Sequence, residues 1–369
     1  MLIATSVVTT KHSRLRARWK LEGGTPPVPG QKTPVQPIPH RNGDTPLRWK
    51  KEDYRIPSDG ELGPSFLVQP DFSGLMQVYD WEAERVIWRS DWNDILVTPS
   101  GFCFADGVMY VADLESAHVF VVDIANEPGK ILCRISHPYL NDIHSLSRTA
   151  RGLLVTSSGT DAVLELSLEG QLLWEWWGPE HGYAMTPAGI ERESGRGAEH
   201  RDHYYHTRYQ STHVNSAFVG GEDDRYVLAL LFHQGTLIRI DRALPEAQQH
   251  GDVIMEGLMR PHALERTTHG WMFANSVGGG LILLDGDLNV ADRIPYEAGW
   301  IQDCTQLGDG RVLLNDVDNH QIVEFAAELS WEIRRIVKYD DEWRMCELVE
   351  TPAEYEFGFR KTTSVTQAG

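Results

Sequence analysis

Short apolar runs separated by polar turns recur through most of the chain from about residue 64 onwards. One unit has a turn at 106–107, a strand at 108–112, a polar loop, and a second strand at 118–123 that ends in Asp. The same order of turn, strand, loop and strand returns in three later units, at 151–166, 269–285 and 309–325. Short strands at regular spacing with turn signals between them are typical of an all-β protein.

A further strand follows the units, as at 171–176 and 330–334. A repeat of about 40–50 residues with four strands indicates a β-propeller. The units begin near residues 64, 100, 143, 212, 261 and 301, which predicts six four-stranded blades. The first blade is expected over 66–92, and the segment 343–349 is expected to add a strand to it, because ring closure removes an exposed sheet edge.

Residues 1–63 differ from the repeating part of the chain. Seven prolines lie between positions 26 and 46, interleaved with Lys and Arg. Proline cannot donate to a sheet ladder, so we expect a Pro-rich, extended N-terminal arm over 1–63. The propeller is expected over 64–350, followed by a C-terminal tail over 351–369.

Three histidines stand near the start of the first strand in consecutive units. Counting back 23 residues from the end of the third strand gives Ser100, His144, His262 and Gln302 in four of the units. His213 lies 28 residues before the corresponding strand end, and the excess fits an enlarged turn at 220–224. Because the innermost strands of a propeller line its axis, the side chains expected to converge there are His144, His213, His262 and Gln302.

This set of side chains predicts a metal site. Neutral imidazoles are the commonest protein ligands for divalent transition metals. Three imidazoles and one amide oxygen would leave a position for substrate, as a catalytic metal requires. The expected cofactor is therefore Fe, Mn or Zn. Without a metal, the same cluster could bind an anionic substrate or act in acid–base chemistry.

Further candidate residues surround this set. The long connection 178–210 is expected to cover the channel mouth, with Tyr205 or His206 acting as acid or base. Asn215 lies two positions beyond His213 and so lines the channel beneath it, where it is a further catalytic candidate. The loops between second and third strands supply candidate substrate-binding groups, namely His233, Asn275 and Asp316.

The composition of the chain argues against some classes of binding partner. The chain has 369 residues and a net charge of −19, which argues against nucleic acid and anionic membrane, since both require clustered cations. No convincing signal peptide is present, and no run approaches the about 18 apolar residues needed to span a bilayer. We therefore expect a cytoplasmic protein with a small-molecule substrate, and the sequence leaves its oligomeric state undetermined.

The GxSxG, P-loop, GxGxxG and HExxH patterns do not occur, which removes several common enzyme classes as obvious choices.

The third unit and the start of the fourth resemble bacterial arylsulfotransferase-like propellers. The resemblance rests on the order of His144, two apolar strands at 153–157 and 163–166, Gly170 and Trp174, followed by 213–216. It implies sulfuryl transfer by a channel histidine without a metal. In composition, three His and one Gln on a propeller axis are similar to the site of oligogalacturonate lyases, where the set holds Mn. That family has seven blades rather than the six expected here.

Three functions remain possible on this reasoning. The first is a metal-dependent lyase, isomerase or oxygenase, and the second is a metal-free transferase. The third is a non-enzymatic propeller that binds a protein or peptide, since a fold does not determine a function.

Overall fold

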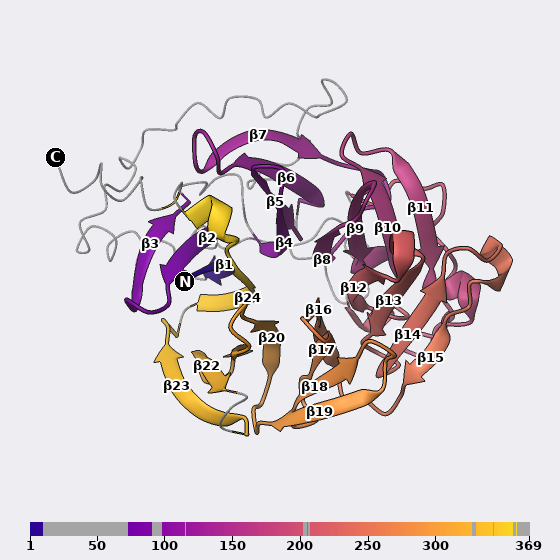
Figure 1. Ribbon diagram of the computed structural model, residues 1–369. Coiled ribbons are helices and arrows are strands. Elements are labelled where there is room, and N and C mark those ends of the chain that lie inside the picture. Colours follow the sequence, from indigo (N-terminus) through magenta and orange to yellow (C-terminus); the bar gives the residue numbers. More distant parts are fainter. Residues whose placement is uncertain are drawn as a thin grey trace.

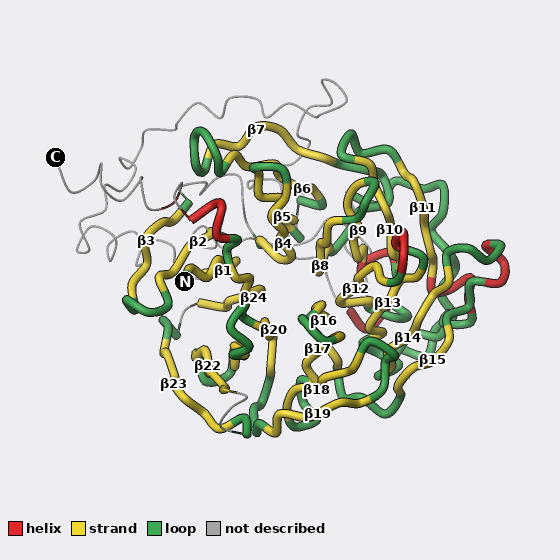
Figure 2. The backbone as a smooth tube through the Cα atoms, in the orientation of Figure 1, coloured by secondary structure: helices red, strands yellow, loops and turns green. Residues whose placement is uncertain are grey.

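The structure is a computed structural model that describes residues 1–9, 73–90, 98–114, 116–201, 205, 207–326, 330–341, 343–356 and 359. Six four-stranded antiparallel sheets surround a central axis (Figure 1). Strands dominate these residues, and the helical segments are all short (Figure 2). The predicted all-β, six-bladed propeller is therefore confirmed. Within the described residues, no helix has the length and apolar composition needed to cross a bilayer.

Five blades are each formed by four strands consecutive in sequence, beginning with the strand nearest the axis. The first of them contains β4 (Pro99–Ala105), β5 (Val108–Asp113), β6 (His118–Asp123) and β7 (Lys130–Ile135). The second contains β8 (Ile143–Arg148), β9 (Gly152–Ser157), β10 (Ala162–Ser167) and β11 (Leu172–Trp177). The third contains β12 (Val214–Gly220), β13 (Tyr226–Leu231), β14 (Thr236–Asp241) and β15 (Asp252–Met255). The fourth contains β16 (Pro261–Arg266), β17 (Gly270–Asn275), β18 (Gly280–Asp285) and β19 (Val290–Pro295). The fifth contains β20 (Ile301–Gln306), β21 (Val312–Asp316), β22 (Gln321–Ala326) and β23 (Glu332–Lys338).

Both ends of the chain build the sixth blade. Its strand order is β24 (Trp343–Glu350), β1 (Leu2–Thr9), β2 (Ser73–Asp80) and β3 (Arg85–Arg89). The expected closure by segment 343–349 is thus observed, because β24 pairs antiparallel with β1 along its length. The sequence placed residues 1–63 in an extension, whereas β1 at their start is the second strand of this blade. The Pro-rich part of the predicted arm lies outside the described residues.

Alternating side chains of each blade pack against different neighbouring blades. In β6, Val119 and Val121 contact the core shared with β8 to β10, whereas Phe120 and Val122 contact the core shared with β1 and β2. Successive strand residues point to opposite faces of a sheet, and here both faces are buried. This explains why the middle strands have continuous apolar sequences.

The inner strands approach one another closely at the axis. A Cβ atom added to Gly101 on β4 would lie 2.6 Å from the backbone nitrogen of Leu146 and 2.7 Å from the Cα of Ser145, both on β8. Glycine at position 101 therefore allows the two inner strands to meet. This close approach brings residues at the start of neighbouring inner strands within reach of one another.

Candidate metal centre on the propeller axis

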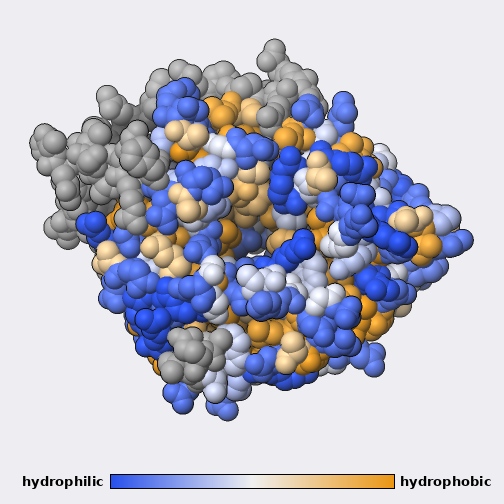
Figure 3. Space-filling view, in the orientation of Figure 1, coloured by the Kyte–Doolittle hydropathy of each residue, from blue (hydrophilic) through white to orange (hydrophobic). Residues whose placement is uncertain are grey.

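Two cavities lie on the axis. The larger one, of about 1180 Å³, is termed the funnel, and its lining includes His144, His213, His262 and Gln302. The smaller one, of about 320 Å³, is termed the chamber. His144, His262 and Gln302 line both cavities and so lie where the two meet. Figure 3 shows the hollow at the centre of one face of the propeller, with hydrophilic side chains around it.

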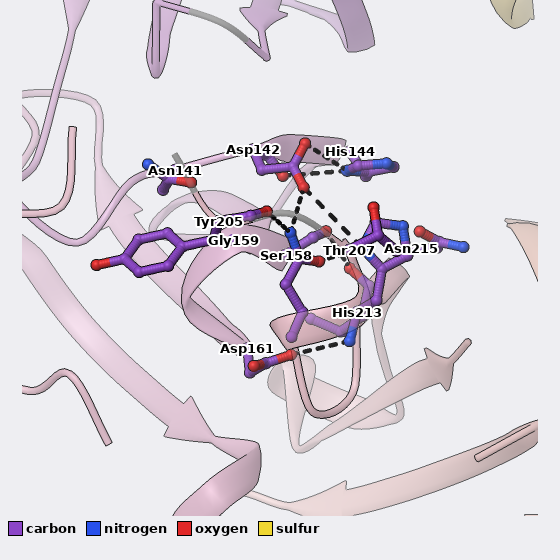
Figure 4. A network of polar contacts seen from close by, with 12 residues as sticks. Asn141, Asp142, His144, Ser158, Gly159, Asp161, Tyr205, Thr207, His213 and Asn215 are labelled. Carbon is purple, nitrogen blue, oxygen red and sulfur yellow. Dashed lines mark hydrogen bonds and ion pairs between the residues drawn. The ribbon is translucent and has the colours of Figure 1, made fainter. Parts of the chain in front are cut away.

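His144 and His213 form a pair at the edge of the funnel (Figure 4). Their ring centroids are 4.6 Å apart and their planes are inclined by 79°. The Asp142 carboxylate lies beside both rings, 3.6 Å from His144 Nδ1 and 3.9 Å from His213 Nδ1. In the described part of the chain, these three residues form the one group of His, Cys, Asp and Glu donors lying within 4.8 Å of one another. Two of the predicted ligands are therefore adjacent, together with a carboxylate that was not predicted as part of the site.

The hydrogen bonds of the imidazoles define which nitrogen is protonated. His144 Nδ1 lies 3.0 Å from the backbone oxygen of Asp142, and His262 Nδ1 lies 3.0 Å from the backbone oxygen of Arg260. A carbonyl oxygen can only accept, so Nδ1 carries the proton in both rings. Their Nε2 atoms then carry the lone pairs that can bind a metal ion.

The side-chain amide of Gln210 determines in the same way which nitrogen of His213 is protonated. Its Nε2 donates to Asp142 Oδ2 at 2.8 Å and to the backbone oxygen of Tyr205 at 2.6 Å. Its Oε1 is therefore turned to His213 Nδ1, which donates to it. Asp142 thus orients His144 directly and orients His213 through the amide of Gln210. No simple spacing rule points to Gln210, because it belongs to the long connection rather than to a strand.

Asp161 anchors the backbone that carries His213. Its carboxylate accepts from the backbone nitrogens of Ser211, Thr212 and His213 at 2.7–2.8 Å and pairs with Arg192 Nη1 at 2.6 Å. His213 adopts a left-handed backbone conformation with φ of 44°. The buried carboxylate therefore stabilises an uncommon conformation that directs the imidazole to the funnel.

Burial keeps the histidines neutral. It lowers the pKa of His213 well below the usual value, and the neighbouring rings of His144, His233 and His262 lower it further. Burial likewise lowers the pKa of His262 to about 3. Both side chains are therefore neutral at neutral pH, which is the form that binds metal ions.

His262 and Gln302 line the funnel but lie outside the group formed by Asp142, His144 and His213. The ring of Phe232 has its centroid 5.0 Å from that of His213 and 5.3 Å from that of His262. Gln302 Oε1 accepts from Trp300 Nε1 at 3.1 Å and from Arg344 Nη2 at 2.9 Å, so both of its lone pairs are engaged. Metal binding by the full set of three histidines and one glutamine stays a prediction.

The candidate substrate-binding residues have different surroundings. His233 lines the funnel, 5.7 Å from His213 between ring centroids, and its Nε2 donates to the backbone oxygen of Thr207 at 2.9 Å. Asn275 and Asp316 line neither the funnel nor the chamber. Each is the last residue of a strand and accepts hydrogen bonds there, Asn275 from Met259 N and Asp316 from the Tyr296 hydroxyl. These contacts give the two residues structural roles.

The long connection contributes to the funnel wall. Pro187, Thr207 and Arg208 line the funnel. The Tyr205 hydroxyl lies 2.8 Å from His200 Nδ1, and Figure 4 shows the tyrosine ring directed away from His144 and His213. This orientation does not place Tyr205 for proton transfer at the pair. His206 lies outside the described residues.

Asn215 lies in the chamber. Its Nδ2 donates to the backbone oxygen of Pro261 at 3.3 Å, while its Oδ1 has no hydrogen-bond partner among the described residues although Asn215 is only 4% exposed. The expectation that Asn215 lines the channel beneath His213 agrees with this position. A catalytic role for it stays a prediction.

No protein-family model and no curated protein matches the chain. Among solved structures, it is similar to one chain of a nidogen/laminin complex, at 9% identity and a TM-score of 0.51, over 78% of this chain and 95% of that chain. Virginiamycin B lyase from Staphylococcus aureus matches at 12% identity and a TM-score of 0.43, over 66% of this chain and 84% of that chain. The β-propeller domain of Cps50 (Swd1) from Myceliophteria thermophila matches at 15% identity and a TM-score of 0.43, over 65% and 71% of the two chains. The likeness to the chain of the nidogen/laminin complex shows the β-propeller fold alone.

Proposed function

We propose that this propeller is a metal-dependent enzyme that acts on a small organic substrate in the funnel. The observation that carries the proposal is the adjacent pair of His144 and His213, backed by the carboxylate of Asp142. An oxygen acceptor at Nδ1 is the usual support of a metal-binding histidine, and here it is the backbone oxygen of Asp142 for His144 and the amide oxygen of Gln210 for His213.

The Nε2 atoms of His144 and His213 would hold the ion, and His262 is a further imidazole on the same cavity. Imidazole nitrogens suit Zn and Fe, whereas Mn prefers oxygen ligands such as the carboxylate of Asp142. When bound, such an ion polarises a carbonyl or carboxylate oxygen or lowers the pKa of a bound water. Lyase, isomerase and oxygenase chemistry are each compatible with this donor set.

Two arginines favour an anionic substrate. Arg260 and Arg344 both line the funnel. The guanidinium of Arg260 lies over the rings of Phe232 and Trp300, at 5.9 Å and 5.6 Å from their centroids, and Arg344 is positioned by its bond to Gln302. Guanidinium groups bind carboxylates and phosphates through paired N–H donors, which supports recognition of such a group beside the histidines.

Metal analysis of purified protein tests the proposal. After chelator treatment, the protein is reloaded with Zn²⁺, Mn²⁺ or Fe²⁺ under anaerobic conditions, desalted and analysed by mass spectrometry for bound metal. We expect one ion per chain in the wild type, lost in His144→Ala and in His213→Ala, and retained in a variant of the exposed His269, His269→Ala. A wild type without stoichiometric metal, or a His213→Ala variant that retains it, would reject the proposal.

Sulfuryl transfer by a channel histidine is a second candidate. The neutral state and available Nε2 atoms of His213 and His262 favour it, because a nucleophilic imidazole must be unprotonated. The two functions differ in their response to chelators. Loss of activity on chelation supports the metal enzyme, whereas unchanged activity with loss in a single histidine variant supports the transferase.

A further inference from the structure

Three carboxylates face the chamber from three consecutive blades. They belong to Glu265 on β16, Asp303 on β20 and Glu347 on β24. No ion pair joins any of them to a cationic side chain in the described part of the structure. Asp303 is buried, whereas Glu265 and Glu347 are partly buried. Carboxylates are seldom buried without a cation or a full set of hydrogen bonds, so Asp303 in particular requires an explanation.

Each carboxylate uses one oxygen to join its inner strand to the next one. Glu265 Oε1 accepts from Gln306 N at 3.3 Å, Asp303 Oδ2 from Leu348 N at 2.5 Å, and Glu347 Oε2 from Phe102 N at 2.5 Å. These hydrogen bonds alone do not explain why the three residues are acidic. On the other half of the ring, serine hydroxyls make the same bond, from Ala217 N to Ser145 Oγ at 3.2 Å and from Leu264 N to Ser216 Oγ at 3.1 Å.

The negative charges of Glu265, Asp303 and Glu347 are unfavourable without a neighbouring cation. Burial and the neighbouring charge of Asp303 raise the pKa values of Glu265 and Glu347 well above the usual range. A cation in the chamber would remove this repulsion and favour the ionised state of all three groups.

Asn215 adds an amide oxygen to the hydrogen-bond acceptors around the chamber. Within the part of the chain that the structure describes, the Oδ1 atom of Asn215 has no hydrogen-bond partner, and Asn215 lines the same cavity. Carboxylate oxygens and an amide oxygen are acceptors, so the ligand that complements them must bring N–H donors or positive charge. Leu146, Leu264 and Leu348 line the same cavity and offer apolar contacts for a carbon chain.

We propose that the chamber binds the primary ammonium group of a small organic amine, with its N–H donors directed to Glu265, Asp303 and Glu347. An alkylammonium group has three donors and can reach three separate acceptors. Among the described residues, these three carboxylates do not meet the spacing expected of the ligands of one metal ion, with donor atoms within 4.8 Å of one another. The volume of about 320 Å³ also exceeds that of an ion and accommodates a short carbon chain.

Calorimetric titration of metal-free protein tests this proposal separately from the metal site in the funnel. The probes are n-butylammonium, its neutral counterpart n-butanol, and Ca²⁺. The two organic probes are added to protein in the presence of a chelator, and Ca²⁺ is added to protein without chelator. We expect n-butylammonium to bind and n-butanol not to bind. This comparison needs no variant, so it holds even where a substitution impairs folding.

Amide variants then identify the groups involved. Glu265→Gln, Asp303→Asn and Glu347→Gln retain an acceptor oxygen for the neighbouring strand but remove the charge. Each should weaken n-butylammonium binding by about 10- to 100-fold, since a hydrogen bond to a charged group contributes that much. Asp252→Asn, at an exposed position on β15, should leave it unchanged. Equal binding of n-butanol, binding of Ca²⁺ without binding of n-butylammonium, or unchanged binding in all three amide variants would overturn the proposal.

Discussion

The imidazole rings of His144 and His213 meet edge to face, with centroids 4.6 Å apart, although they belong to different blades. Each residue lies at the axial start of its blade, next to or within the innermost strand. Equivalent positions of adjacent blades converge at the axis, so two residues far apart in the chain become neighbours. The integrity of the pair therefore depends on how the blades are packed and on the residues that orient each ring.

Asp142 is expected to determine metal affinity without being needed for the fold. Asp142→Asn removes the negative charge beside the Nδ1 atoms of His144 and His213 while preserving the size of the side chain. We expect metal affinity to fall by about 10- to 100-fold, as for other groups that orient metal-binding histidines. Competition with a chromogenic chelator measures the change, and Asp287→Asn, at an exposed position, is the matched control. Equal affinities in the two variants would show that Asp142 does not orient the pair.

Asp161 is expected to stabilise the whole blade junction. Asp161→Ala would leave Arg192 without its carboxylate and three backbone N–H groups without acceptors. Breaking a buried ion pair from one side costs about 3–5 kcal/mol. Urea unfolding followed by tryptophan fluorescence should show this loss in the free energy of unfolding. A loss below about 1 kcal/mol would mean that water replaces the carboxylate at no great cost.

His137 provides a pH dependence outside the site. Burial, and then the charge of Arg201, lower its pKa from 6.5 to about 4, and Tyr139 N donates to its Nδ1 at 3.2 Å. The folded pKa lies below the unfolded one, so the unfolded chain binds more protons between pH 4 and 6.5. The contribution of His137 to the free energy of unfolding is therefore present above pH 6.5 and is lost as pH falls towards 4, with a slope of at most about 1.4 kcal/mol per pH unit.

The measurement for His137 is the difference between the wild type and His137→Gln across this pH range. The variant lacks the titrating group, so its stability should fall less steeply on acidification. Parallel stability curves for the two proteins would contradict the lowered pKa.

Gly101 is expected to be intolerant of a side chain. The Cβ of Gly101→Ala would lie 2.6 Å from the backbone nitrogen of Leu146, and backbone atoms of β8 cannot move without disturbing the axis. Overpacking of this kind costs about 1–3 kcal/mol. Thermal unfolding should show the lower stability, with Gly286→Ala as the control because nothing lies near a Cβ there. Equal melting temperatures would indicate that the inner strands can separate.

The alternation of apolar runs and polar turns predicted the blades well, because it is a local property of the chain. The strands starting at Pro99, Ile143, Val214, Pro261 and Ile301 lie close to the predicted unit starts. The same counting identified His144 and His213 as equivalent positions of adjacent blades. Strand β1 was missed because its pairing with β24 joins the two ends of the chain, and no local pattern marks that contact.

The sequence by itself determined the number of blades, the closing strand and the register of the axial histidines, since each follows from a repeat of strands and turns. Only the tertiary structure showed that Asp142 and Gln210 orient the pair, that Tyr205 is directed elsewhere, and that Glu265, Asp303 and Glu347 share one chamber. The physical reason is that these relationships are contacts between blades. They depend on the direction of side chains around a shared axis, which the spacing of residues within one blade does not specify.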